Sequence, residues 1–275
     1  MTAGRKSIRS AMALWCLLTV PVIAAADTST RGEATVVDSL VITVVYDNVT
    51  AREDLLPSWG FSCLIQGLEK VILFDTGADG QILLGNMRAL NLSPDLIDVV
   101  ILSHQHNDHT GGLFQLLREH SDLTVYALDS FPGHLTGEIA ASGAGLVTVS
   151  DSVSVCANAL LTGPMGTSIP ETGLILKTTG GLVIITGCAH PGIDAVIERS
   201  VELGADRPYL VMGGFHLFGT SRQGVREIIG QFRSRGVHRV SPCHCTGPEA
   251  IEMFHQSYQE NYLPCGVGQV IEVTP

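Results

Sequence analysis

One run of ten residues, Ser103 to Gly112, constrains this chain more than any other feature. Three histidines and one carboxylate lie within six of its positions: His104, His106, Asp108 and His109. An apolar run, Val99 to Leu102, directly precedes it and predicts a buried strand that ends in a polar loop. Zinc and similar metals favour imidazole and carboxylate ligands, and α/β folds place their chemistry at strand ends. The spacing therefore predicts a metal-binding loop; the simpler alternative is a polar loop that happens to contain three histidines.

The first 26 residues have the three-part layout of a secretory signal peptide. Three basic residues precede an apolar stretch, Ala11 to Ile23, and three alanines follow it. The apolar stretch is short for a membrane span. We therefore predict a signal peptide over residues 1–26, an exported protein that is periplasmic or secreted, and no stable membrane insertion after cleavage. An uncleaved N-terminal anchor is the alternative.

We predict one domain, residues 27–275, and a small-molecule substrate. Hydrophobic residues make up 45% of the 275 residues, enough for a substantial core. Cleavage after residue 26 removes three basic and no acidic residues, which changes the formal net charge from −11 to −14. Because nucleic-acid binding depends on clustered Lys and Arg, so acidic a chain predicts no nucleic-acid partner. Six of the seven cysteines follow residue 26, and in an exported protein they can pair. Their pairing and the oligomeric state are left open.

Apolar runs with the composition of strands alternate with segments of helical spacing. The predicted strands are 40–46, 61–66, 71–74, 99–102, 123–127, 153–161, 172–178, 182–186, 209–212, 237–241 and 267–273. The predicted helices are 81–90, 113–120, 193–203, 224–235 and 249–258. Each half of the chain begins with strands suited to hairpins and continues with alternating strands and helices. We therefore predict an α/β (α+β) fold, a four-layer αββα sandwich of two mixed sheets.

Four further predicted strands are followed by a residue that can ligate a metal. These residues are Asp75, Cys188 with His190, His216, and His244. Because the carboxyl ends of parallel strands meet at one edge of a sheet, we expect their loops to gather around one site. Any one of these histidines taken alone would more often be structural.

Together these motifs resemble the metallo-β-lactamase superfamily, whose H-x-H-x-D-H signature is matched at residues 104–109. The segments 74–77, 187–192, 213–216 and 242–247 resemble one branch, the metal-dependent hydrolases related to dihydropterin-ribofuranosylaminobenzene 5′-phosphate synthase. The resemblance runs from about Leu40 to Val273. It implies a metallo-β-lactamase-like fold and one or two zinc ions, with Mn²⁺ or Fe²⁺ as alternatives.

The resemblance also implies roles for individual residues. His104 and His106 would hold a first metal, and Asp108 with His109 would hold a second. His244 matches the late-chain histidine of that second site. Asp75 would lie behind the ligands and orient the loop and its histidines, a contribution on which metal sites depend.

The middle of the chain departs from the superfamily pattern. A His-x-x-Gly ligand usually precedes a hairpin, and a bridging Asp follows it, but no histidine lies between His134 and His190. Gly187 to His190 reads Gly-Cys-Ala-His where Gly-Asp is expected. We predict His190 as the replacement ligand and Cys188 as a further ligand or a group behind the ligands. His216 is predicted as a catalytic residue, either a ligand or a proton donor.

The predicted activity is hydrolysis by a metal-activated water, with Asp108 or a metal-bound water taking up the proton after attack. The bond would be an ester, lactone, lactam or phosphoester in an unassigned substrate. Export favours a lactam, whereas the branch suggests a phosphorylated, pterin-like compound. The alternative is an exported metal-binding or ligand-sensing protein with little turnover, because the bridging carboxylate is missing. Asp75-Thr76-Gly77 also fits an aspartic protease, but that chemistry needs a second carboxylate and leaves the histidines unexplained.

Overall fold

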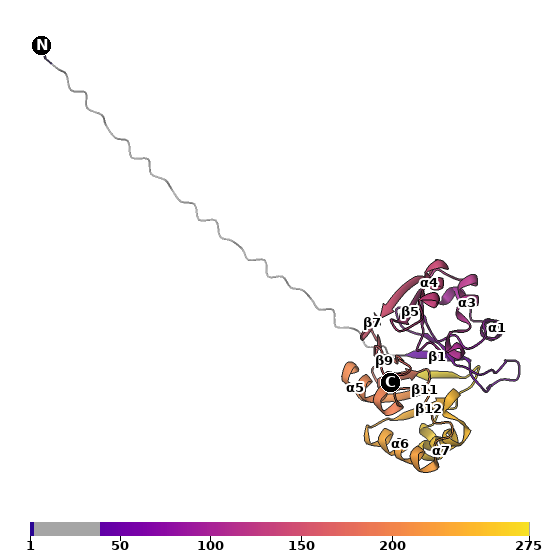
Figure 1. Ribbon diagram of the computed structural model, residues 1–275. Coiled ribbons are helices and arrows are strands. Elements are labelled where there is room, and N and C mark those ends of the chain that lie inside the picture. The colour runs from indigo at the N-terminus through magenta and orange to yellow at the C-terminus, as the bar shows by residue number, and fades with distance from the viewer. Residues whose placement is uncertain (3–38, 275) are drawn as a thin grey trace. The chain divides into compact units, whose positions relative to one another are not determined.

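The computed structural model describes residues 1–2 and 39–274 (Figure 1). The chain divides into two units, residues 1–33 and 34–275, and the fold described below is that of the second. The signal peptide predicted over residues 1–26 lies outside the described residues except for its first two, so it stays a prediction. Within the described part of the chain, no helix combines the length and the apolar character that a membrane crossing requires.

The first sheet has seven strands in the order β13-β1-β2-β3-β4-β5-β6. They are β1 (Leu40–Tyr46), β2 (Ser62–Gln66), β3 (Ile72–Phe74), β4 (Val99–Ile101), β5 (Thr124–Leu128), β6 (Gly145–Val149) and β13 (Val270–Val273). The strands from β3 to β6 run parallel, and the other pairs are antiparallel. Phe74 of β3 is paired with Ile101 of β4. The residues that follow these strands, Asp75 and Leu102, therefore leave the sheet at the same edge.

The second sheet has six strands in the order β12-β11-β10-β9-β8-β7. They are β7 (Val153–Cys156), β8 (Ala159–Leu161), β9 (Leu174–Thr178), β10 (Gly181–Thr186), β11 (Pro208–Gly214) and β12 (Arg239–Cys243). The strands β10, β11 and β12 run parallel. Thr186 is paired with Gly213, and Gly214 is paired with Cys243. The loops after these three strands therefore start side by side.

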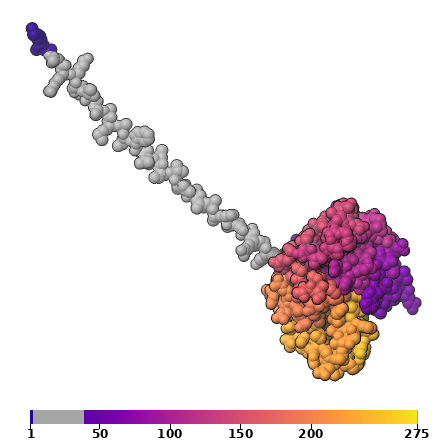
Figure 2. Space-filling view, viewed as in Figure 1, coloured from indigo at the N-terminus to yellow at the C-terminus, as the bar shows by residue number. Residues whose placement is uncertain are grey.

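Helices cover the outer face of each sheet. They are α1 (Gly80–Ala89), α2 (Asn107–Thr110), α3 (Leu113–Glu119), α4 (Gly133–Ala141), α5 (Ile193–Gly204), α6 (Arg222–Ser234) and α7 (Pro248–Tyr258), with 3₁₀ turns η1 (Pro94–Leu96), η2 (His244–Thr246) and η3 (Gln259–Asn261). Figure 1 shows α1, α3 and α4 on one side of the strands and α6 and α7 on the other. In the space-filling view of Figure 2, the first half of the fold (indigo to magenta) likewise lies above the second half (orange to yellow). This four-layer αββα sandwich of two mixed sheets confirms the predicted fold class.

The alternation of side chains along the inner strands explains the long apolar runs in the sequence. Every residue of β10 is buried. Val183 and Ile185 pack into a core that the two sheets share, whereas Leu182 and Ile184 pack beneath the helices of the second half. A strand covered on both faces must be apolar at successive positions, which is why β10 lacks an alternating pattern.

Three parts of the fold differ from the sequence prediction. The strand predicted over residues 153–161 is two antiparallel strands, β7 and β8, because Ala157 and Asn158 form a turn between them. The segment 130–145, which had no assignment, contains α4 and the start of β6. The last strand, β13, pairs with β1, so the end of the chain completes the first sheet. Sequence periodicity does not specify a partner strand so distant in the chain.

Candidate metal centre

The histidine-rich loop after β4 is held in place by one buried carboxylate. Asp75 follows β3 and is fully buried. Its Oδ1 accepts a hydrogen bond from the backbone N–H of Ser103 at 2.7 Å, and its Oδ2 accepts one from the Ser103 hydroxyl at 2.8 Å. Oδ2 also lies 2.7 Å from Nδ1 of His109. Asp75 therefore fixes both the start of the loop and one of its imidazoles.

The first group of ligand atoms comes from His104, His106 and His190, whose atoms all lie within 4.8 Å of one another. Nε2 of His104 is 3.1 Å from Nδ1 of His106. The other ring nitrogen of His104, Nδ1, lies 2.9 Å from the hydroxyl of Ser103. That contact orients the imidazole of His104 so that its Nε2 faces the other two histidines.

The second group comes from Asp108, His109 and His244, again within 4.8 Å of one another. Oδ2 of Asp108 is 3.3 Å from Nε2 of His244 and 3.6 Å from Nε2 of His109. The outer nitrogen of His244, Nδ1, lies 3.1 Å from Oδ1 of Asn48. Asn48 also donates from Nδ2 to the His244 carbonyl, and the His244 N–H donates to Oδ1 of Asp47. The loop after β1 therefore holds the imidazole that arrives from the far end of the chain.

Cys188 lies between the two groups. Its Sγ is 3.3 Å from Nε2 of His109, and it groups within 4.8 Å with His104 and His109, and with His244 and Cys245. It also groups with His190 and His216, and the His216 ring is exposed at the edge of the site. The cysteine that stands where a bridging aspartate was expected is thus central to the site.

The loop that carries Cys188 and His190 is held by a second buried carboxylate, Glu171. Its Oε1 accepts hydrogen bonds from the N–H groups of Cys188 at 2.8 Å and Ala189 at 2.9 Å. Its Oε2 accepts one from the N–H of His190 at 2.9 Å. Asp75 thus holds the loop after β4, and Glu171 holds the loop after β10.

Backbone strain is concentrated at this site. In the described part of the chain, seven residues other than glycine have positive φ angles, and four of them are site residues: Asp75, Ala189, His216 and His244. Such conformations cost on the order of 1–3 kcal/mol each and persist where the surroundings hold them. Their clustering points to a functional site, independently of the histidine motif.

The protonation states of His104, His190 and Asp108 suit metal binding. Burial, with the neighbouring His109, lowers the pKa of His104 far below its ordinary value, and burial with His216 nearby lowers the pKa of His190 to about 4. Burial acts to raise the pKa of Asp108, but the contact with His244 and the charge of His109 outweigh it and lower that pKa. Neutral imidazoles and an ionised carboxylate are the forms that bind metals.

Two unsatisfied ring nitrogens also fit a metal. Among the described residues, Nε2 of His190 and Nε2 of His244 are buried and make no hydrogen bond, one in each group of ligands. The short distance from His244 to Asp108 lacks hydrogen-bond geometry. A buried polar atom without a partner is costly, and a divalent ion bound in each group would give each of these nitrogens a partner. The two groups are therefore suited to hold one ion each, with Cys188 close to both.

Part of the rim of the site is aromatic. The ring of Trp59 lies 4.9 Å from the ring of His244 and remains 54% exposed. Its position is fixed by Gly60, whose N–H donates to Asn48 and whose φ is 141°. A side chain at Gly60 would put its Cβ 2.4 Å from the Asp108 carbonyl oxygen, so only glycine allows this approach.

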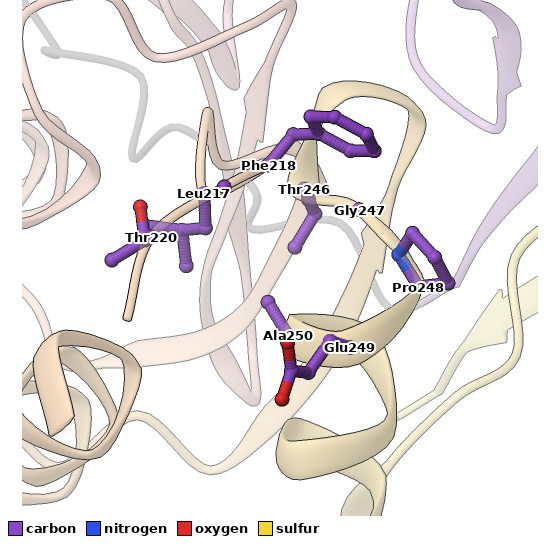
Figure 3. Close-up of a pocket in the computed structure, with 9 residues that line it drawn as sticks. Leu217, Phe218, Thr220, Thr246, Gly247, Pro248, Glu249 and Ala250 are labelled. Carbon is purple, nitrogen blue, oxygen red and sulfur yellow. The ribbon is translucent and has the colours of Figure 1, made fainter. Parts of the chain in front are cut away.

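A pocket lies next to the site, lined by residues 217–220 and 246–250. Figure 3 shows Leu217 and Thr220 on one side of it and Pro248, Glu249 and Ala250 on the other, with the ring of Phe218 above Gly247. Phe218 is 71% exposed, and its N–H donates to the carbonyl of Cys245, one residue after His244. Exposed aromatic rings therefore reach the His244 turn from two loops.

The structure brings together every site residue predicted from the sequence. These are Asp75, His104, His106, Asp108, His109, Cys188, His190, His216 and His244. Sequence reasoning missed the residues that hold them, namely Asp47, Asn48, Ser103 and Glu171. Only Ser103 had a local signal, its place beside His104. The ligand roles themselves stay predictions.

Comparisons with known proteins agree with this geometry. A sequence profile described as Metallo-beta-lactamase superfamily matches residues 60–201, just over half of the chain. A protein of Methanocaldococcus jannaschii, named 7,8-dihydropterin-6-methyl-4-(beta-D-ribofuranosyl)-aminobenzene-5'-phosphate synthase, is 29% identical over 268 residues, which cover 78% of this chain and 91% of that protein.

Solved structures share the fold. The crystal structure of Tm1679, described as a metal-dependent hydrolase of the beta-lactamase superfamily, superposes with a TM-score of 0.72 and 27% identity, covering 86% of this chain and 100% of the other. The metallo-beta-lactamase fold protein YhfI from Bacillus subtilis superposes with a TM-score of 0.61 and 14% identity, over 86% of this chain and 100% of that one. The second likeness shows the fold alone.

We expect the double substitution His104→Ala, His106→Ala to remove the ion of the first group, because only His190 would remain there. Metal content after zinc loading, measured by mass spectrometry, should fall by at least one ion per chain. The matched control is His255→Ala, since His255 is an exposed histidine on α7 outside both groups. Undiminished zinc content in the double variant would show that this group is not a metal site.

Proposed function

Because the chain belongs to the metallo-beta-lactamase superfamily, we propose that it is a metal-dependent hydrolase that cleaves an ester, lactone, lactam or phosphoester bond. One observation carries the proposal: six side chains that could bind a metal, from both halves of the chain, form two adjacent groups at one edge of the sandwich. Zinc is the proposed ion, because imidazole, carboxylate and thiolate donors together suit it, with Mn²⁺ or Fe²⁺ as alternatives.

The proposed metal ligands are His104, His106 and His190 in one group and Asp108, His109 and His244 in the other, with Cys188 beside both. A bound divalent ion supplies Lewis acidity, which lowers the pKa of water and polarises a carbonyl or phosphoryl bond. The protein supplies the rest. Asp108, whose side chain is 20% exposed, can accept the proton of the attacking water. His216, exposed at the edge, is the proposed proton donor to the leaving group.

The surroundings of the site favour a substrate with an apolar part. Trp59 and Phe218 expose aromatic rings at the rim, and Leu56, on the same loop as Trp59, is 61% exposed. Such a surface suits an ester, lactone or lactam that carries an apolar group better than it suits a phosphorylated compound, as in the name of the Methanocaldococcus jannaschii relative. We therefore favour an ester, lactone or lactam.

A second candidate function is metal-dependent ligand sensing with little turnover. The observation that favours it is Cys188, a thiol at the position of the expected bridging carboxylate. A thiolate binds zinc strongly and leaves fewer open coordination positions for a substrate. This alternative differs from the first in turnover and not in metal content.

A hydrolysis panel separates these functions. Zinc-, manganese- and iron-loaded protein would be assayed with nitrocefin, γ- and δ-lactones, p-nitrophenyl esters and bis(p-nitrophenyl) phosphate. We expect metal-dependent turnover of an ester, lactone or lactam that disappears in the His104→Ala, His106→Ala variant. Bound metal without turnover on the whole panel would support the sensing function. Undiminished turnover in the double variant would contradict both.

Trp59 gives a test of the substrate side. Stacking on an aromatic ring is worth on the order of 1 kcal/mol, so Trp59→Ala should lower kcat/KM about 3- to 10-fold for the best substrate that carries an aromatic group. A small acetate ester should be affected little, and zinc content should not change. Leu96→Ala removes an exposed apolar side chain of η1 and serves as the control. An equal loss on both substrates would refute recognition by Trp59.

We also propose that the protein is exported, with residues 1–26 removed. The supporting observation is the sequence layout of that segment, basic and then apolar and then small. Intact-mass measurement of the protein purified from a bacterial periplasmic fraction should give a chain that begins at Asp27. Recovery of the full-length chain in the membrane fraction would favour the uncleaved anchor instead.

A further inference from the structure

Glu171 is a buried carboxylate outside the set of metal ligands, and only 2% of it is exposed. It lies just before β9, and the three groups that donate hydrogen bonds to its carboxylate are backbone N–H groups of one loop, between β10 and α5. The donors are the consecutive residues Cys188, Ala189 and His190. Both carboxylate oxygens are therefore committed to the backbone of the loop that carries two ligand side chains.

The loop needs such a partner because its backbone is strained. Ala189 has a φ angle of 60°, which is unfavourable for a residue with a side chain. In this conformation three successive N–H groups turn towards Glu171. The flanking side chains then point to different parts of the site: Cys188 Sγ lies 3.3 Å from His109 Nε2, and the His190 ring lies 4.8 Å from that of His104.

Burying the carboxylate of Glu171 carries a desolvation cost. Burial raises the pKa of Glu171, and the three backbone N–H groups and the charge of His109 act to lower it. Among the described residues, Glu171 forms no ion pair with lysine or arginine. A buried carboxylate that accepts hydrogen bonds from three successive N–H groups of one loop is well placed to order that loop.

We propose that Glu171 is a positioning residue of the metal centre, which holds residues 188–190 so that this one loop supplies a ligand to each of the two groups. It acts through Cys188 and His190 and touches neither ion itself. Residues behind metal ligands commonly change metal affinity about 10- to 100-fold when they are replaced. The inference rests on the proposed metal centre. It extends that centre to a residue that lies in the sequence between His109 and Cys188.

The test is Glu171→Gln, which keeps the size of the side chain but replaces one acceptor oxygen by an amide group that faces an N–H donor. We expect zinc affinity, measured by competition with a chromophoric chelator, to fall about 10- to 100-fold. In cobalt-loaded protein the sulfur-to-metal charge-transfer absorption of Cys188 should weaken or shift. Glu202→Gln, an exposed glutamate on α5, is the matched control and should leave both readouts unchanged.

A double-mutant cycle distinguishes positioning from general stability. If Glu171 acts through the loop, Glu171→Gln should weaken zinc binding much less in a His190→Ala, Cys188→Ser background than in the native chain. If Glu171→Gln does not fold, Glu171→Asp takes its place, because it keeps the charge but shortens the reach to the three N–H groups. Its zinc affinity should also fall.

Native zinc affinity and a native cobalt spectrum in the folded Glu171→Gln variant would overturn the proposal, as would full additivity in the cycle. These readouts do not involve turnover. If the native chain binds zinc and hydrolyses nothing, the proposed hydrolase function fails while the role of Glu171 is still decided by metal affinity.

Discussion

The candidate metal centre depends first on the contact between Asp75 and the loop after β4. A fully buried carboxylate receives two hydrogen bonds from Ser103 and lies 2.7 Å from His109. Without these contacts the ends of β3 and β4 would lie side by side, but the histidine loop would have no fixed direction. Glu171 does the same for the loop after β10, and Asn48 does so for His244. The candidate ligands are thus held in place by Asp75, Glu171 and Asn48, which are not among the proposed ligands.

This division explains how two sheets make one site. The parallel strands bring five loops to one edge, which is the contribution of the fold. The buried acids and the amide then hold three of these loops, those after β4, β10 and β12, and the backbone is left-handed at Asp75, Ala189 and His244. The hydrogen bonds between Asn48 and His244 connect residues that are far apart in the sequence, and so join the first loop of the fold to one of its last.

The sequence was informative where the signal is local. The spacing of residues 104–109, the apolar strands and the ligand-type residue after each strand predicted the sandwich and the set of residues at its edge. Glu171 could not be found in this way, because its partners lie 17 to 19 residues later and are backbone groups. Asp47 and Asn48 contact a residue nearly 200 positions away. The pairing of β13 with β1 was hidden for the same reason.

The central claim is that both halves of the chain supply ligands to two adjacent ions, with a cysteine between them. The most direct measurement is the crystal structure of the zinc-loaded protein with anomalous scattering at the zinc edge. The account predicts two peaks, one about 2.0–2.1 Å from nitrogens of His104, His106 and His190 and one on Asp108, His109 and His244, with the sulfur of Cys188 about 2.3 Å from the second. Zinc bound outside these groups, or a Cys188 sulfur turned away from both ions, would contradict it.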